Sequence, residues 1–244
     1  MILIPTPKGI RVLMYHKISR DKTDFLTVST DQFESHIKHL QSLGYQFITT
    51  QELLDFYLKK QALPDKPLLL SLDDGYLNNL EYAYPILKKY KAKATIFIPS
   101  NFVGSTNKWD NGNDFIMSVE QLKNLDSSVF ELGLHSHTHP NFKNITLDSI
   151  EKEVRENIAF FSDNNIPYTP VLAYPYGARP RGDSFFKMLE IFKKQGILAA
   201  FRIGNSVNPF NIKNLYELKR IDIRGTDSFN DFKKKVEKGR MKLL

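Results

Sequence analysis

Seven apolar runs recur along the 244-residue chain, and segments with helical spacing lie between most of them. The runs lie around residues 10–15, 68–72, 94–99, 129–134, 170–174, 197–203 and 216–223. Short continuous runs of this kind are typical of strands that are buried on both faces, as in a parallel sheet. The pattern therefore predicts seven buried strands.

The intervening segments carry apolar residues at the three- and four-residue spacing of amphipathic helices. The first begins after Ser29-Thr30-Asp31 and ends at Gly44, and its apolar stripe consists of Phe33, Ile37, Leu40 and Leu43. Similar helices are expected at residues 52–62, 82–90, 147–161 and 185–194. Strands that alternate with helices predict an α/β fold whose parallel sheet closes into a barrel, with the chemistry at the carboxyl ends of the strands.

The composition predicts one globular domain over residues 1–244. Hydrophobic residues make up 41% of the chain, which is enough for a single large core. No internal repeat, low-complexity tract or clear linker divides the sequence. The chain has no cysteine, so disulfide bonds play no part in the prediction.

Two adjacent carboxylates follow the second apolar run. Pro67-Leu68-Leu69-Leu70 leads into Ser71-Leu72-Asp73-Asp74-Gly75, where the glycine ends the strand. At such a terminal turn both side chains can converge on one cleft, one as a metal ligand and the other as a base. Taken alone, Asp-Asp-Gly is more typical of a solvated turn, so the interpretation depends on what else lies at the same face.

Three of the six histidines fall within five residues after another apolar run, in His135-Ser136-His137-Thr138-His139. If this segment turns, His135 and His139 face the same side and His137 points elsewhere. Two imidazoles and one carboxylate form the ligand set of an open catalytic metal site. A structural zinc site would need a fourth protein ligand, usually sulfur, which this chain lacks.

Both segments resemble the hallmark motifs of the polysaccharide deacetylases, carbohydrate esterase family four. The resemblance covers nearly the whole chain and implies a distorted, incomplete (β/α) barrel of about seven strands. It implies that Asp73 is the catalytic base and that Asp74, His135 and His139 hold one divalent metal ion, Zn²⁺ in first place, with Co²⁺ or Ni²⁺ as alternatives. The implied reaction is hydrolysis of the N-acetyl group of an amino sugar by metal-activated water.

The third family motif is usually Arg-x-Pro-Tyr, and the matching stretch is Ala173-Tyr174-Pro175-Tyr176-Gly177. The resemblance implies that the backbone N–H of Tyr176, after Pro175, binds the oxyanion that forms during acyl transfer. Alanine stands where the family has the arginine that steadies the catalytic aspartate. Without the other motifs, this stretch would be typical of a simple aromatic turn.

We expect Arg220 to replace the missing motif arginine. It lies in the strand predicted at 216–223, where alternation places Arg220 and Asp222 on one face. An ordinary salt bridge between Arg220 and Asp222 is the alternative interpretation. Arg179 and Arg181 lie in a loop and are weaker candidates.

The departing amine needs a proton donor, and no histidine follows His139. Met14-Tyr15-His16-Lys17-Ile18 resembles the subgroup of deacetylases that act on poly-N-acetylglucosamine, in which the acid histidine comes first. The resemblance implies that His16 is the general acid. A lone histidine at a strand end is more often a structural, hydrogen-bonded residue.

The remaining histidines and the single tryptophan receive weaker interpretations. His36 and His39 are expected to be solvated residues of the first helix. Residues 104–113 predict a long loop over the active face. Trp109 in that loop fits a ring that stacks on a sugar and fits equally well a packed, structural tryptophan.

The charge balance is basic, with 34 Lys and Arg against 27 Asp and Glu, a net charge of +7. Much of the excess lies near the C-terminus, at Lys233, Lys234, Lys235, Lys238, Arg240 and Lys242. This segment fits peripheral contact with an anionic polymer or membrane, although a lysine-rich helix is more often a solvated face. Nucleic-acid binding is not expected, because no basic face is interleaved with aromatic residues in a recognisable module.

The first residues, Met1-Ile2-Leu3-Ile4-Pro5, form too short an apolar run for a signal peptide and lack a preceding basic region. No apolar run is long enough to span a membrane. The sequence as given therefore predicts a cytoplasmic protein, and an extracellular or cell-envelope location follows only if a leader has been trimmed. The oligomeric state stays open.

The sequence thus predicts a metal-dependent hydrolase that deacetylates an N-acetylated amino sugar in a polysaccharide or its precursor. Two alternatives stay open. One is a deacetylase or amidohydrolase of a small non-polymeric amide. The other is a catalytically silent carbohydrate-binding protein of the same fold, which the alanine at position 173 and the missing C-terminal histidine make conceivable.

Overall fold

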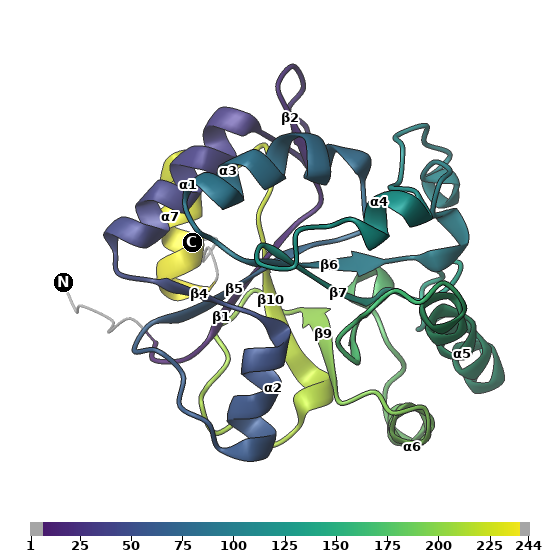
Figure 1. The fold of residues 1–244 in the computed structure, drawn as a ribbon. Helices are drawn as coiled ribbons and strands as arrows, with labels where there is room; N and C mark the ends of the chain where they lie inside the picture. Colours follow the sequence, from purple (N-terminus) through teal and green to yellow (C-terminus); the bar gives the residue numbers. More distant parts are fainter. Residues whose placement is uncertain (1–6, 240–244) are drawn as a thin grey trace.

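A parallel barrel forms the centre of the computed structural model, which describes residues 7–239 (Figure 1). Its strands are β1 (Arg11–Tyr15), β5 (Pro67–Leu72), β6 (Ala94–Ile98), β7 (Phe130–Leu134), β8 (Val171–Ala173), β9 (Ala199–Ile203) and β10 (Leu218–Asp222). They follow the order β1-β10-β9-β8-β7-β6-β5, and pairing of β1 with β5 closes the ring. The predicted barrel of about seven strands is therefore confirmed, one strand short of a full (β/α) barrel of eight.

The ring is distorted at two places. A short strand, β4 (Gln46–Ile48), pairs with the first half of β5, and β6 pairs with the second half of the same edge. Between β7 and β8 the register consists of one residue pair, Leu134 with Leu172. Two further short strands, β2 (Lys17–Ser19) and β3 (Thr27–Ser29), pair with each other beside the barrel.

Helices surround the barrel (Figure 1). They are α1 (Thr30–Ser42), α2 (Thr50–Lys59), α3 (Tyr84–Lys89), α4 (Val119–Lys123), α5 (Leu147–Asp163), α6 (Asp183–Lys194) and α7 (Phe229–Lys238). Ser29 caps α1 through a capping box with Gln32. The helix predicted at 82–90 differs, because a π-helical turn at Asn79–Ala83 precedes the shorter α3.

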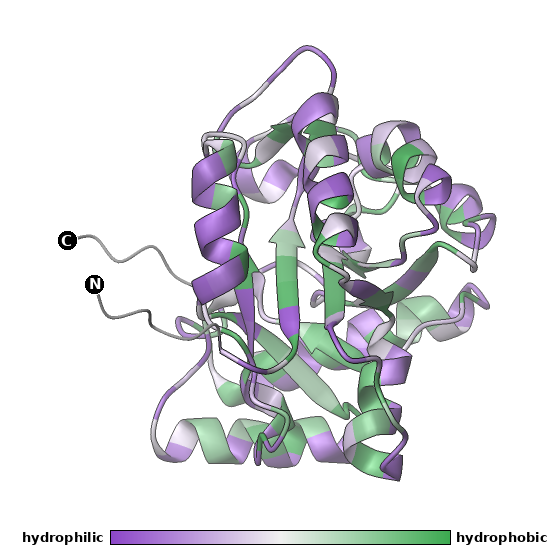
Figure 2. Cartoon of the chain, turned by 90° about the vertical axis from the view of Figure 1, so that its left-hand side faces the viewer, coloured by the Kyte–Doolittle hydropathy of each residue, from purple (hydrophilic) through white to green (hydrophobic). Residues whose placement is uncertain are grey.

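Apolar side chains point to both faces of the strands, which explains the continuous apolar runs. On β5, Leu68 and Leu70 belong to the large cluster between the barrel and its helices, whereas Leu69 belongs to a second cluster. That second cluster contains Phe97 of β6 and Leu53 of α2, so α2 packs against it. In Figure 2 the inner strands are mostly green, the hydrophobic colour, whereas the helices around them carry both purple and green residues.

Within residues 7–239, the helices are all too short or too polar to cross a membrane. Of the lysine-rich C-terminal segment, Arg240 and Lys242 lie outside the described residues.

Candidate metal and acid–base site

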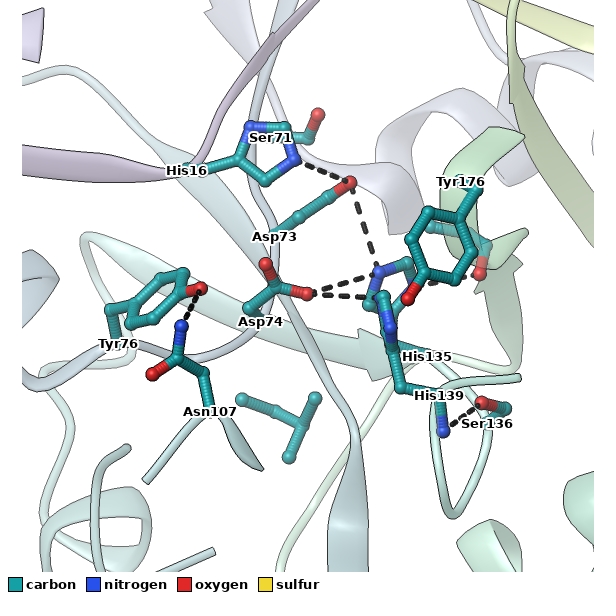
Figure 3. Close-up of polar contacts among 12 residues, drawn as sticks. His16, Ser71, Asp73, Asp74, Tyr76, Asn107, His135, Ser136, His139 and Tyr176 are labelled. Atoms are coloured by element: carbon teal, nitrogen blue, oxygen red, sulfur yellow. Dashed lines mark hydrogen bonds and ion pairs between the residues drawn. The ribbon is translucent and has the colours of Figure 1, made fainter. Parts of the chain in front are cut away.

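The pairing of β1 with β5 brings His16 and Asp73 together. The two strands run in register up to Tyr15 and Leu72, so the next residue of each strand lies at the same point of the rim. The Asp73 N–H donates to the Tyr15 carbonyl at 2.9 Å. His16 Nε2 lies 4.0 Å from Asp73 Oδ2 (Figure 3). Two residues that are 57 positions apart in the chain thus face each other because the barrel closes.

Asp74 faces the two histidines that the spacing selects. Its Oδ1 lies 3.4 Å from His135 Nε2 and 3.3 Å from His139 Nε2 (Figure 3). All three residues are buried. His137 points elsewhere, as predicted, and its Nδ1 lies 2.9 Å from the Ser100 hydroxyl.

The donor set fits one divalent cation. His135 Nδ1 contacts the Ala173 carbonyl at 2.7 Å, and because a carbonyl only accepts, Nδ1 carries a proton and Nε2 is the ring nitrogen that faces Asp74 and could bind a cation. One ligand atom from each of the three residues lies within 4.8 Å of the others. Asp74 Oδ1 and His139 Nδ1 are buried without a hydrogen-bond partner among the described residues. A cation between these groups would satisfy the carboxylate oxygen and the facing nitrogen lone pairs.

Asp73 has a different partner, the guanidinium of Arg220. The pair is bidentate, with Arg220 Nη1 2.5 Å from Asp73 Oδ1 and Nη2 2.8 Å from Oδ2. Both side chains are almost fully buried. Burial alone would raise the pKa of Asp73, but the charges of Arg220, His135 and His16 outweigh it and lower the pKa below its usual value. Asp73 is therefore held ionised without belonging to the metal-ligand set.

Asp74 is also held ionised. Burial would raise its pKa, and the rings of His135 and His139 reverse the shift, so the pKa lies well below its usual range. A carboxylate that is buried, ionised and flanked by two histidine rings is a strong site for a cation.

The structure places Arg220, and neither loop arginine, against the candidate base. Arg179 pairs with Glu217, and Arg181 is exposed. The alternative pairing of Arg220 with Asp222 does not form, since Asp222 Oδ2 instead accepts from Arg224 Nε at 2.6 Å. Arg220 and Asp222 were expected on one face of the strand, but they do not form an ion pair. The Arg220 side chain instead reaches Asp73, at the end of β5.

Ala173 contributes through its backbone. Its carbonyl fixes the His135 ring, a contact that needs no particular side chain at this position. The guanidinium that the family motif would supply here comes instead from β10.

Two aromatic rings pack on the ring of His139. The ring centroids of Trp109 and Tyr176 each lie 4.8 Å from its centroid. Trp109 also contacts Phe102, so it is packed at the site. Tyr176 follows the buried Pro175 and has a left-handed backbone with φ of 57°. Its hydroxyl donates to Asp110 at 3.3 Å, and burial, together with that carboxylate, raises its pKa to about 12.

The prediction that His36 is solvated is wrong. Its ring is 2% exposed, stacks on Phe232 of α7 at 3.7 Å and contacts the Tyr15 hydroxyl at 3.2 Å. Helix α7 covers this side of α1 and buries His36. The spacing of residues within α1 could not reveal this contact. His39 is partly buried against Phe229.

The lysine-rich helix is not uniformly solvated either. Lys235 is buried, and its Nζ contacts Asp227 Oδ2 at 2.5 Å and donates to the Asp222 carbonyl at 2.8 Å. It therefore ties α7 to the carboxyl end of β10. Lys234 and Lys238 are exposed, and contact of this segment with an anionic surface stays a prediction.

Asn157 of α5 also reaches the site, and the sequence interpretation missed it. Its Oδ1 accepts the N–H of His135 at 3.1 Å. The available signal was its position, because it falls in the apolar stripe formed by Ile150, Val154 and Phe161. A polar residue in such a stripe is unusual unless it has a buried partner.

Comparison with known proteins agrees with this geometry. Residues 60–197 match the family described as polysaccharide deacetylase. Poly-beta-1,6-N-acetyl-D-glucosamine N-deacetylase of Staphylococcus aureus is 31% identical over 198 residues, which are 78% of this chain and 66% of that protein. The chain spans 58% to 66% of the length of the curated relatives that it matches first.

Two solved structures share the fold. Deacetylase PplD of Streptococcus pyogenes, in complex with acetate, has a TM-score of 0.77 at 22% identity and covers 95% of this chain and 100% of PplD. IcaB from Ammonifex degensii has a TM-score of 0.76 at 22% identity and covers 93% of this chain and 95% of IcaB. Because the family match spans more than half of the sequence, the chain belongs to the polysaccharide deacetylase family, carbohydrate esterase family four.

Proposed function

We propose that this protein is a metal-dependent hydrolase that removes N-acetyl groups from an N-acetylated amino sugar in a polysaccharide or its precursor. The observation that carries the proposal is the division of partners between two adjacent carboxylates. Asp74 faces two imidazoles at 3.3 and 3.4 Å, whereas Asp73 is held by Arg220 and flanked by His16. Amide hydrolysis needs this combination of a cation site and a neighbouring base.

Asp74, His135 and His139 would hold the ion, with Zn²⁺ in first place and Co²⁺ or Ni²⁺ as alternatives. Such an ion supplies a Lewis acid for the acetamide carbonyl and lowers the pKa of a bound water toward about 7. Asp73 lies beside the ligands and is ionised, so it can accept the proton of the attacking water. Arg220 keeps it in that state and orients both of its oxygens.

His16 is the proposed general acid. It approaches Asp73 Oδ2 from the opposite side to His135, which lies 3.9 Å from the same oxygen (Figure 3). A proton on His16 could therefore reach the departing amine from the side of the site opposite the metal ligands. The backbone N–H of Tyr176 is the proposed oxyanion donor, and the buried Pro175 before it restricts the turn.

A polymer of N-acetylglucosamine is the proposed substrate class. The relative from S. aureus is named for its action on poly-beta-1,6-N-acetyl-D-glucosamine, and it covers most of this chain. The position of the candidate acid directly after β1, ahead of the other site residues in the chain, also resembles that subgroup. Both points support the proposal by similarity.

Acetate release tests the substrate class. Zinc-loaded protein is incubated with β-1,6-linked N-acetylglucosamine oligomers, chitin oligomers, the N-acetylglucosamine monomer and a small acetamide. We expect release from the oligomers at a higher kcat/KM than from the monomer. Release from the small amide alone would support the non-polymeric alternative, and oligomer binding without any release would support the silent carbohydrate-binding protein.

A further inference from the structure

The loop that carries both histidine ligands, residues 135–139, has a strained backbone. Ser136 has a φ of 64° and His139 a φ of 58°, in the left-handed region that residues other than glycine avoid. Each such residue is held in a conformation that is unfavourable for a side chain with a Cβ atom. The loop needs this conformation, because it turns His139 back toward Asp74. Something outside the loop must hold it.

Glu153 of α5 holds the tip of the loop. Its Oε2 accepts the N–H of His137 at 2.9 Å and the N–H of Thr138 at 2.7 Å. Its Oε1 accepts from the Thr138 hydroxyl at 2.5 Å. A single carboxylate thus satisfies three donors of two consecutive loop residues. Hydrogen bonds to an ionised acceptor are among the stronger ones in proteins.

Asn157, one helical turn further along α5, holds the start of the loop. It is fully buried, and its Oδ1 accepts the N–H of His135 while its Nδ2 donates to the Ile98 carbonyl at 3.1 Å. Ile98 is the last residue of β6, so this amide joins the ends of β6 and β7. Glu153 and Asn157 are four residues apart and therefore lie on the same face of one helix.

We infer that Glu153 and Asn157 are positioning residues of the metal site, which act by fixing the loop that presents His135 and His139 to the ion. The inference rests on the proposed function only for the identity of the site as a metal centre. Neither residue belongs to the ligand set. Loss of such outer contacts typically weakens metal affinity 10- to 100-fold.

The test is the zinc dissociation constant of metal-free protein, measured by competition with a chromophoric chelator. This measurement needs no substrate and no turnover. Glu153→Ala should raise the constant roughly 10- to 100-fold. Glu153→Gln should recover most of the affinity, because its carbonyl oxygen can accept both N–H groups and its amide can donate to the Thr138 hydroxyl.

Glu156→Gln is the matched control. Glu156 lies on the same helix, and its Oε2 is 3.8 Å from His137 Nε2. Among residues 7–239, it accepts no hydrogen bond from the backbone of the loop. We expect its zinc constant to equal that of the wild type.

A merely structural role predicts a different result. In that case Glu153→Ala lowers the melting temperature of the metal-free protein while its zinc constant stays within twofold of the wild type, and this result would overturn the inference. If the alanine variant does not fold, Glu153→Asp carries the same prediction, since its carboxylate is one methylene short of the loop. The Asn157→Ser variant should likewise bind zinc more weakly.

The two proposals fail in distinguishable ways. Zinc binding by the wild type without acetate release would overturn the proposed hydrolase, and the dissociation constants would still decide the role of Glu153. No zinc binding by the wild type would overturn the inference together with the metal centre.

Discussion

The carboxylates of Asp73 and Asp74 are neighbours in sequence, but they lie in different electrostatic environments. Asp73 forms a bidentate ion pair with Arg220, and that pair occupies both of its oxygens. Among residues 7–239, the partners of Asp74 are the two histidine rings, with no Lys or Arg side chain. The backbone at Asp74 is left-handed, with φ of 72°, and Asp74 Oδ1 faces both histidine ligands, whereas Asp73 is paired with Arg220.

Substitutions at the two aspartates should separate metal binding from turnover. Asp74→Ala should lose both bound zinc and activity, because it removes one of three ligands. Asp73→Asn should keep zinc and lose turnover by at least about 10²-fold, because it removes the base. Metal content by atomic absorption and acetate release measure the two effects. Equal loss of zinc in both variants would contradict this division of roles.

His16→Ala should lower turnover by about 10² to 10⁴-fold, the usual contribution of a general acid, with zinc content unchanged. The side chain contacts Asp73 only at 4.0 Å, so its removal leaves the Asp73–Arg220 pair in place. Near-normal turnover of the variant would reject His16 as the acid.

Removal of Arg220 should be costly because Asp73 would remain buried without a partner. Arg220→Ala is expected to destabilise the fold by about 3–5 kcal/mol, as measured by urea denaturation. Combining it with Asp73→Asn should cost less than the sum of the single variants, because no unpaired charge is then left in the interior. Additive effects in this double-mutant cycle would show that the ion pair is not coupled as the structure implies.

At the scale of elements, strand pairing explains why residues distant in sequence share one site. The register of β1 with β5 places His16 beside Asp73, and β10 lies next to β1. Arg220 therefore reaches Asp73 from the far side of β1. These contacts depend on closure of the barrel, so the acid–base site should be lost together with the β1–β5 pairing.

Burial on both faces made the seven barrel strands predictable, because each reads as a continuous apolar run. The strands β2, β3 and β4 were not predictable, since three residues carry too little pattern. Alternation within β10 predicts one shared face for Arg220 and Asp222, but the partner of Arg220 is set by the position of β5 across the barrel. The burial of His36 and the loop contacts of Glu153 depend on packing between elements and have no local signature.

The packing of α1 against α7 should make stability depend on pH. Burial, with a smaller effect of the His39 charge, lowers the pKa of His36 to about 3, so the folded protein keeps this ring neutral while the unfolded chain protonates it below its ordinary value near 6.5. The folded state then binds fewer protons, and stability falls as pH falls through this window, by up to about 1.4 kcal/mol per pH unit.

His36→Phe tests this dependence because phenylalanine keeps a ring against Phe232 but does not titrate. Between about pH 6 and pH 4, the unfolding free energy of the variant should fall less steeply than that of the wild type. His39→Gln should change the slope less, since that ring is only partly buried. Identical slopes for wild type and His36→Phe would contradict the assignment.

Over the whole molecule, one closed barrel presents the proposed catalytic and metal-ligating residues at the carboxyl ends of its strands. Asp73 follows β5, His135 follows β7, Tyr176 follows β8 and His16 follows β1. We propose that residues 1–244 form a single catalytic domain, although the curated relatives are longer than this chain. The ionised groups in the site are Asp73, Asp74 and Arg220. The net charge of +7 is therefore carried by residues outside the site.

The most direct test of the account is acetate release from β-1,6-linked N-acetylglucosamine oligomers by protein that has been stripped of metal and then titrated with zinc. We predict no release by the stripped protein and activity that rises with zinc to a plateau at one ion per chain, with the Asp74→Ala variant inactive throughout. Equal release by stripped and zinc-loaded protein, or activity retained in Asp74→Ala, would contradict a metal-dependent deacetylase built on Asp74, His135 and His139.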